Sequence, residues 1–460
     1  MRYLLLLFLL VNGTIIFCQD DVFLPKDTVV IVDNIFISGN KKTKTNIVLR
    51  EMFFKQGDTI ATNQLDEKIE QSKQFIINTT LFVDVAIHYT KLPNNKIAVI
   101  VLLKERWYIF PLPYFKLVDR NFNDWWVNQN RDLSRVNYGL KFTHNNLSGN
   151  NDKLNLQLIT GYNRQIALQY ELPFCNKKLT NGFSIGIVHS KQKELNYLTS
   201  TINKQLFYKQ VDGFAKTYTR IEAAFTNRPD KFARHIFRLG YTSENISDSL
   251  LLKNQNYYGN NLISISYINF SYTYQYLKTN YNPYPTNGFG FGFYVGVRGL
   301  DKTTNLNQFI ATSIFAKPIN KKIYFRARGG LNIKFPYNSY FINQSLFGSG
   351  DFQLRGMEYY VVDGMMGLIG KFNLGYDLGT LKLKLPIKNK TYNNIPFKFY
   401  GKIYTDVGYC YNPYINNNLF NNKALHTYGI GLDIVTIYDI VFKLEYSFNQ
   451  IGDKGLYVGN

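Results

Sequence analysis

The chain has 460 residues, of which 45% are hydrophobic and 16% aromatic, and it carries a formal net charge of +21 at pH 7. This length allows two or three ordinary domains or one large closed sheet, and the apolar content excludes a disordered polymer. The histidines are scattered and no Cys/His cluster has metal-ligand spacing, so we expect neither a metal site nor a cofactor.

Residues 1–18 have the pattern of a secretory signal peptide. A basic start precedes an apolar stretch, residues 3–11, that is too short for a transmembrane helix, and Cys18 stands at the expected cut. A positive charge of this size suggests nucleic acid as a partner, but an exported protein is separated from it. We therefore expect an anionic membrane surface as the partner of this charge. The mature chain keeps Cys175 and Cys410, and the sequence leaves open whether they pair.

Residues 28–104 predict a small α/β module with the order β-α-α-β-β. Its last part shows the clearest pattern, because Val83, Val85 and Ile87 alternate with polar or small residues before a turn at Pro93. The predicted elements are a strand over 29–38, a helix over 45–52, a helix around 65–76, a strand over 83–89 and a strand over 97–103.

From residue 107 to residue 460 the pattern has a period of two. Ile166, Leu168 and Tyr170 share one face of a predicted strand, while Gln165 and Gln169 share the other. Two later segments, residues 371–378 and 440–448, alternate in the same way. Each of these strands therefore has one apolar face and one polar face.

Two folds satisfy such alternation. A soluble sandwich buries its apolar faces in a core, whereas a transmembrane barrel turns them to lipid and keeps polar residues in its lumen. Export, abundant aromatic residues and alternation without helices favour the barrel. At roughly 22 residues per strand and connection, this region holds about 16 strands. The expected fold is therefore mainly β: a transmembrane antiparallel barrel after one N-terminal α/β domain.

One carboxylate on the predicted luminal face needs a partner. In the strand over 397–410, Asp406 shares its face with Gly408, which leaves room for a bulky group. An arginine fork matches a carboxylate with two parallel hydrogen bonds, which lysine cannot do. Arg355 is the candidate, because it lies in a long glycine-rich loop, residues 335–364, that can fold back into the barrel.

These residues resemble motifs of the bacterial outer-membrane assembly factors of the BamA/TamA type, which join POTRA modules to a 16-stranded barrel. In that family a loop between strands 11 and 12 carries a V-R-G-F/Y-like motif, matched here by residues 354–357, Leu-Arg-Gly-Met. The family arginine is held by an aspartate of a D-x-G motif on strand 13, matched by Asp406 and Gly408.

The N-terminal module is similar to a POTRA domain. Gly57-Asp58 matches a "GD" before the second helix, residues 81–87 match an "LFxDVxI" strand, and residues 146–150 match an "NLxGxG" phrase early in the barrel. Only one such module fits here, and Met357 replaces the usual aromatic residue. The resemblance implies a loop–lumen brace made by Leu354, Arg355, Gly356, Asp406 and Gly408. It implies client binding at the POTRA strand that contains Val83, Asp84, Val85 and Ile87.

The expected function is non-enzymatic, with no catalytic residues. The resemblance implies an outer-membrane factor with its POTRA-like domain in the periplasm, which inserts other β-barrels. Its implied partners are unfolded outer-membrane proteins, outer-membrane lipids and accessory assembly proteins. A dedicated secretion pore with one client and a passive pore are the alternatives. A G-x-S-x-G match at residues 182–186 points to a barrel hydrolase only if a strand-turn-helix carries Ser184.

Overall fold

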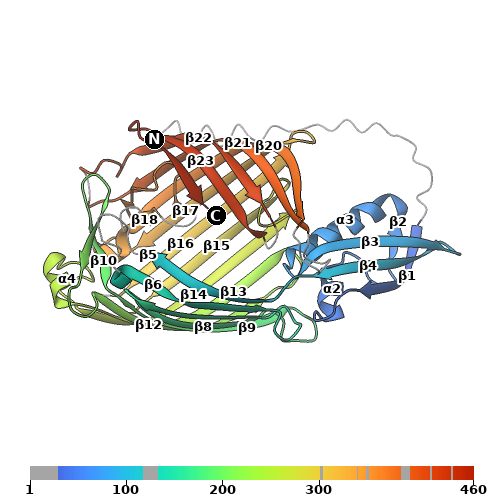
Figure 1. Ribbon diagram of the computed structural model, residues 1–460, viewed down its shortest axis with the longest axis horizontal. Coiled ribbons are helices and arrows are strands. Elements are labelled where there is room, and N and C mark those ends of the chain that lie inside the picture. The colour runs from blue at the N-terminus through green and yellow to red at the C-terminus, as the bar shows by residue number, and fades with distance from the viewer. Residues whose placement is uncertain are drawn as a thin grey trace.

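The structure is a computed structural model that describes residues 29–117, 133–300, 304–338, 340–348, 352–384, 394–414, 417–436 and 439–459. It has two parts (Figure 1): a β-barrel, and a small α/β module, coloured blue, at one end of the barrel. The predicted signal peptide lies outside the described residues. Within them, no helix is long and apolar enough to cross a membrane. Cys175 and Cys410 are both free thiols.

The N-terminal module has the expected element order with one short strand added. Its four-stranded sheet has the order β2-β1-β4-β3, and β1 runs parallel to β4. The added strand, β2, follows Gly57, whose φ of 88° turns the chain back toward β1. Ile47, Ile76 and Ile97 are fully buried in a core between the helices and the sheet. The elements are β1 (Val29–Ser38), α2 (Thr45–Glu51), β2 (Thr59–Ala61), α3 (Thr62–Asn78), β3 (Phe82–Leu92) and β4 (Lys96–Glu105).

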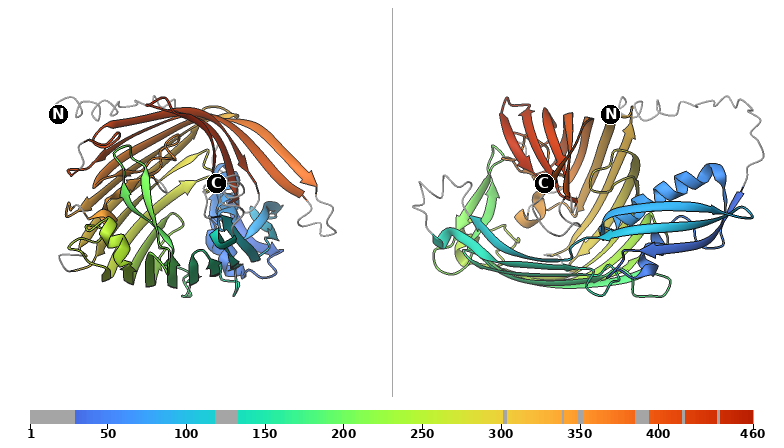
Figure 2. Two further views of the ribbon diagram at one scale, coloured as in Figure 1. Left: turned by 60° about the vertical axis from the view of Figure 1, so that its left-hand side comes forward. Right: turned by 45° about the vertical axis from the view of Figure 1, so that its right-hand side comes forward.

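A single sheet of 16 strands forms the barrel, seen from two further sides in Figure 2, and every neighbouring pair is antiparallel. Consecutive strands pair in chain order, so β5 and β24 are the two ends of the sheet. The strands are β5 (Ile109–Leu117), β6 (Val136–Asn145), β7 (Lys153–Gly161), β8 (Arg164–Leu172), β9 (Asn181–Gln192), β12 (Lys216–Asn227), β13 (Ala233–Ile246), β14 (Ser264–Thr279), β15 (Gly288–Arg298), β16 (Leu306–Pro318), β17 (Ile323–Phe335), β20 (Met366–Lys384), β21 (Asn394–Tyr411), β22 (Ala424–Val435), β23 (Val441–Asn449) and β24 (Lys454–Gly459).

The apolar face of the strands is on the outside. On β20, Phe372, Leu374 and Tyr376 are 38–42% exposed, whereas Asn373 between them is 5% exposed and faces the lumen. A soluble sandwich would bury the first set, so the barrel expectation is confirmed and the sandwich is excluded. The mainly β fold class, a transmembrane barrel after one α/β domain, is likewise confirmed.

Short elements cover the end of the barrel away from the N-terminal module. Asn203, in the hairpin between β10 and β11, is fully buried and donates to Val361 O at 3.1 Å and to Asn421 Oδ1 at 2.9 Å. Three surface segments thereby join into one cover. The elements at this end are a 3-10 turn (Leu133–Arg135), β10 (Glu194–Thr199), β11 (Gln205–Lys209), α4 (Asp248–Lys253), α5 (Phe341–Gln344), β18 (Ser345–Phe347) and β19 (Val362–Asp363).

Candidate functional site

The candidate site is a luminal brace in which Arg355 meets Asp406. Arg355 lies in the connection between β17 and β20, and Asp406 lies on β21. Arg355 Nε donates to Asp406 Oδ2 at 2.9 Å and Nη2 donates to Oδ1, while the Arg355 main-chain N–H also donates to Oδ2 at 3.0 Å. Nη1 donates to Asn373 Oδ1 at 2.6 Å, and the guanidinium carbon lies 3.8 Å from the Tyr404 ring centroid. The fork therefore uses both carboxylate oxygens, as predicted.

The pair is almost removed from water. The Asp406 side chain has no exposed area, and that of Arg355 is 12% exposed. A carboxylate in such a place is stable only when its oxygens accept several hydrogen bonds, and here they accept three. The arginine also makes contacts through Nη1 and through one face of its guanidinium plane. These contacts together fix both the position and the orientation of the arginine.

The predicted neighbours of the pair allow the loop to approach the wall. Gly356 has a φ of 79°, and a Cβ there would lie 2.8 Å from the Ser447 Cβ. At Gly408 a Cβ would lie 3.2 Å from Leu354 Cδ1 and 3.1 Å from the Phe347 ring, so this glycine makes room for the loop. Leu354 is 2% exposed and packs in an apolar cluster with Phe347. All five predicted brace residues are thus brought together.

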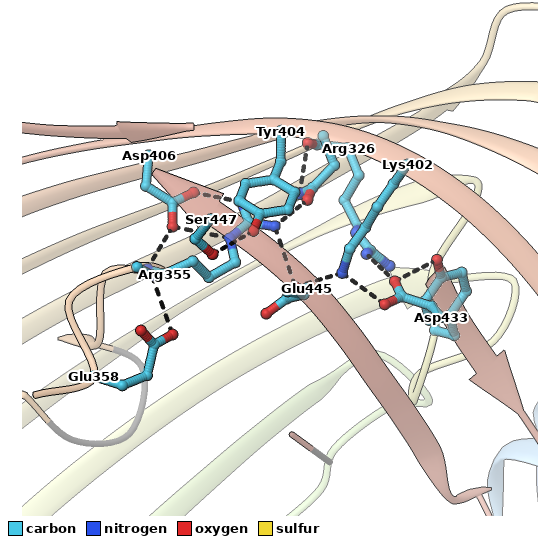
Figure 3. Close-up of polar contacts among 12 residues, drawn as sticks. Arg326, Arg355, Glu358, Lys402, Tyr404, Asp406, Asp433, Glu445 and Ser447 are labelled. Carbon is cyan, nitrogen blue, oxygen red and sulfur yellow. Dashed lines mark hydrogen bonds and ion pairs between the residues drawn. The ribbon is translucent and has the colours of Figure 1, made fainter. Parts of the chain in front are cut away.

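The brace is one end of a longer network of buried charges (Figure 3). Glu445 Oε1 lies 3.6 Å from Arg355 Nη1 and 2.6 Å from Lys402 Nζ. Lys402 Nζ also lies 2.6 Å from Asp433 Oδ1, and Arg326 Nη2 lies 3.7 Å from Asp433 Oδ2. Three cations and three carboxylates, with Asp406 counted, are therefore linked across β17, β21, β22 and β23.

Balanced charges explain why this network is tolerated inside the barrel. Each ion taken out of water costs several kcal/mol, and only close opposite charges with good hydrogen bonds offset that cost. Removing one partner leaves a buried charge without compensation, which typically costs about 3–5 kcal/mol. What the arrangement can do is hold the Arg355 loop against β20, β21 and β23.

The partners of Lys402 were missed by sequence reasoning. The period-two pattern places Lys402 and Asp406 on one strand face, and places Glu445 on the polar face of its own strand. It does not show which strands are neighbours or how they are registered. The register pairs Lys402 with Gly431 and Gly431 with Glu445, and these two pairings bring Lys402 and Glu445 to either side of a residue without a side chain.

The network continues toward the N-terminal module through one turn. Tyr284, in the turn between β14 and β15, donates to Asp433 Oδ2 at 2.8 Å. In the same turn the Asn282 main-chain N–H donates to Asn78 Oδ1, at the end of α3, at 3.0 Å. Tyr281 donates to Asp439 Oδ1 at 2.6 Å. Polar contacts therefore link the luminal network to the module.

A second group of contacts fixes helix α2 to barrel turns. Arg228 Nη1 and Nη2 lie 2.9 and 3.0 Å from the two oxygens of Glu51, whose side chain is 1% exposed. Arg50 Nε donates to Leu179 O at 2.6 Å and Nη2 donates to Arg228 O at 3.1 Å. Burial, with the nearby Arg228 charge, lowers the pKa of Arg50. This docking contact joins the module to the turns after β8 and β12.

The phrase at residues 146–150 belongs to the same interface. Asn146 is fully buried and donates through Nδ2 to Thr43 Oγ1 at 2.9 Å, and Gly149 O accepts the Lys44 main-chain N–H at 3.0 Å. Gly149 has a φ of 83°, and a Cβ there would lie 2.5 Å from Lys42 O. The glycine of this phrase is therefore required by close approach of the N-terminal module to the turn between β6 and β7.

The predicted client strand is β3, at one edge of the N-terminal sheet. Its pairing with β4 is broken by a bulge between Phe82 and Asp84. Val85 is 1% exposed and Ile87 packs against the same core, so these two side chains face inward rather than toward a client. Asp84 is exposed and Val83 is half-buried. Only the main chain of the free edge and the exposed side chains can therefore contact another chain.

The two ends of the barrel sheet also present free edges. Within the described residues, β5 and β24 form no strand pair with each other. β24 pairs with β23 over six positions only, from Lys454 to Gly459. β5 contains Pro111 and Pro113, which lack backbone donors and, being two residues apart, remove two donors from one side of the strand. This seam is the least paired part of the barrel wall.

The G-x-S-x-G match does not have the context that a nucleophile elbow needs. Ser184 lies inside β9, which runs straight from Asn181 to Gln192 and is paired with β8 and β12 along its length. No turn or helix follows the serine within this strand. The glycines flanking it are strand residues, and Gly182 is crowded by the main chain of Pro173.

Comparison with known proteins agrees with this architecture. The POTRA family, described as a surface antigen variable number repeat, matches residues 30–106. BamA from Haemophilus ducreyi lacking POTRA domains 1–3 is 15% identical, with 93% of this chain and 83% of that chain covered and a TM-score of 0.50. CdiB from Escherichia coli is 10% identical, with 93% and 75% covered and a TM-score of 0.55. No curated protein matches. The chain therefore has one POTRA domain followed by a 16-stranded barrel, the POTRA-plus-barrel fold of the BamA/TamA-type family.

Proposed function

We propose that this protein is an outer-membrane assembly factor that helps other β-barrels to insert, with its POTRA domain in the periplasm. The observation that carries the proposal is the free edge at each end of the barrel sheet, on β5 and β24. A strand edge binds an incoming strand through main-chain hydrogen bonds, which do not depend on the client's side chains. A closed barrel with a regular last-to-first ladder would offer no such template.

The POTRA domain supplies a second edge for the same purpose. β3 is an outer strand of its sheet, and its exposed side carries polar groups such as Asp84. An unfolded client strand that adds to β3 keeps its backbone groups hydrogen-bonded before it reaches the membrane. Burial of client apolar side chains in lipid then supplies the free energy of insertion, and no nucleotide is required.

The luminal network supports the proposal that the seam opens while the rest of the barrel stays intact. Its salt bridges join β17, β21, β22 and β23, and the Arg355 loop ties them together from inside. Among the described residues, β24 contributes no side chain to these ion pairs; its Tyr457 packs against Tyr359 of the loop, with ring centroids 5.9 Å apart. The wall on one side of the seam is therefore braced, while the last strand is held by a short ladder.

Depletion of the protein followed by quantitative proteomics of the outer membrane tests this function. An assembly factor predicts that many outer-membrane barrels fall together. Loss of one secreted protein alone would replace the proposal with a dedicated secretion pore, and ion conductance with no change in any client would replace it with a passive pore. We propose no enzymatic activity; lipolysis by the purified protein that Ser184→Ala abolishes would contradict that.

A further inference from the structure

Two cations face each other on the outer wall of the barrel, and the described residues place no ion-pair partner beside them. Arg164 on β8 and Lys191 on β9 are direct cross-strand partners. Both point outward, because they are spaced by even numbers of residues from the exposed Ile166 and Ile187. In the part of the chain that the structure describes, neither side chain makes a hydrogen bond or an ion pair; the Phe214 ring lies 5.4 Å from the Arg164 guanidinium carbon and 5.9 Å from Lys191 Nζ.

This pairing is unfavourable as it stands. Like charges directly opposite each other across two strands repel, and an aromatic ring offers polarisable electrons but no negative charge. The repulsion would be relieved by an anion bound between the two side chains. We call the pair Arg164 and Lys191 the cationic rim. It lies at the ends of β8 and β9 that are away from the POTRA domain, which is the extracellular side in the proposed orientation.

An apolar hollow lies directly below the cationic rim on the same strands. It has a volume of about 620 Å³, and Ala223 forms its floor because its cross-strand partners are the larger Ile185 and Leu239. Further toward the rim, His189 Nδ1 and Thr219 Oγ1 are 2.9 Å apart and form a polar step between the two zones. From the extracellular edge inward, the outer wall is thus cationic, then polar, then apolar and concave.

We propose that this wall binds one lipid whose headgroup is a net anionic phosphate with no cationic group attached, with the phosphate between Arg164 and Lys191 and an acyl chain over Ala223. The guanidinium fork and the ammonium group together match the several oxygens and the charge of a phosphate. A soluble phosphate would satisfy the cations but leave the hollow empty. The order of the three zones follows the order of headgroup, linker and hydrocarbon in an outer-leaflet lipid. The inference depends on the barrel spanning the membrane, and it is independent of what the protein inserts or exports.

Native mass spectrometry of the full-length protein tests the site. The protein is released from detergent micelles that contain phosphatidic acid, or phosphatidylcholine with the same acyl chains, or inorganic phosphate alone. The wild type is expected to retain phosphatidic acid in preference to phosphatidylcholine. The Arg164→Gln/Lys191→Gln variant is expected to lose that retention by about tenfold, since two charge-assisted contacts are removed. Because this change also removes a repulsion, the barrel should stay folded.

A variant that keeps both charges provides an independent check. Ala223→Leu fills the hollow and is expected to weaken retention, whereas Ala327→Leu, the same change among outward residues of β17 opposite Phe315 and Phe372, should have no effect. Heat-modifiable gel mobility confirms folding of each variant. Unchanged phosphatidic acid retention in the double variant, equal retention of both lipids, or inorganic phosphate binding as tightly as the lipid would each overturn the proposal.

Discussion

At the scale of one residue, the contacts of Arg355 show why a lysine could not replace it. Its planar fork binds both oxygens of Asp406 and the Asn373 carbonyl at once, and its flat face lies on Tyr404. An ammonium group is a compact charge that cannot reproduce this planar geometry. The same region holds Lys402 where a single point charge between two carboxylates is sufficient. The two cation types therefore match two kinds of luminal contact.

Substitution in the brace should destabilise the folded barrel. We expect Arg355→Lys to weaken the contact and Asp406→Asn to cost about 3–5 kcal/mol, because it leaves the buried arginine without its charge partner. The temperature at which the folded band disappears on a gel should fall in both variants. Lys398→Gln is the matched control, on the same strand but exposed. If neither brace variant differs from this control, the brace does not stabilise the barrel.

Substitution of Gly356 tests the close approach of the loop to β23 without any change in charge. Gly356→Ala should lower the same transition temperature, because the new Cβ would lie 2.8 Å from Ser447 Cβ at a φ of 79°. Gly452→Ala is the control, since Gly452 has a φ of 89° but no atom within 4 Å of the added Cβ. The control shares the backbone strain and lacks the clash. An equal fall in both variants would show that strain, rather than contact with β23, limits the loop.

At the scale of elements, the position of the POTRA domain depends on contacts with four barrel turns, those that follow β6, β8, β12 and β14. Phe53 and Phe75 pack with Phe232 beside the Glu51 contact, with ring centroids 5.0 to 6.0 Å apart. An aromatic cluster next to a buried ion pair excludes water, which strengthens the electrostatic part of the contact. The docking contact is therefore different in kind from the exposed pair of Lys96 and Asp33 on the same domain.

Neutralising Glu51 should release this docking. Glu51→Gln leaves Arg50 and Arg228 close together without a carboxylate, so the turn over residues 228–232 should exchange its amide hydrogens faster. Hydrogen–deuterium exchange measured by mass spectrometry reports this directly. Lys96→Gln breaks an exposed salt bridge and should leave the exchange unchanged. Equal protection of the turn in the Glu51→Gln variant would mean that the aromatic cluster alone holds the domain.

For the whole molecule, the central feature is a long sheet that is strongly braced in one region and free at its ends. The luminal network that includes Arg355 lies on β17 and β21 to β23, and the described residues show no ladder between β5 and β24. In the proposed function, a client strand pairs at this seam while the rest of the wall stays intact. The proposed function belongs to this scale, because no single residue performs it.

Site-specific photocrosslinking distinguishes the seam from the rest of the wall. A photoreactive phenylalanine analogue in place of Phe115 on β5 should capture nascent outer-membrane proteins in cells. The same analogue in place of Phe291 on β15 should not, although that side chain is also exposed on the outer face. Capture at both positions to the same extent would indicate non-specific binding to the outer wall. Capture at Phe291 alone would exclude pairing of client strands at the seam.

Much of this architecture follows from local pattern. Side chains of a strand alternate between two faces, so the alternation of Phe372, Asn373 and Leu374 is enough to assign them to the outside or the inside of the wall. The same rule put Asp406 in the lumen, the long glycine-rich loop made Arg355 its candidate partner, and the resemblance to the assembly factors supported the pairing. The fold class, the single N-terminal domain and the brace are therefore accessible from the sequence, because each depends on residues that are close in the chain or on a known motif.

The remaining features needed the tertiary structure, because they depend on which strands are neighbours and how far each ladder extends. Lys402, Asp433 and Glu445 come from three strands, and only the register brings the lysine ammonium within 2.6 Å of both carboxylates. Glu51 and Arg228 are 177 residues apart in the chain. The missing ladder between β5 and β24 also needed the structure, since a strand's sequence sets its faces, whereas its hydrogen-bond partners depend on how the whole sheet closes.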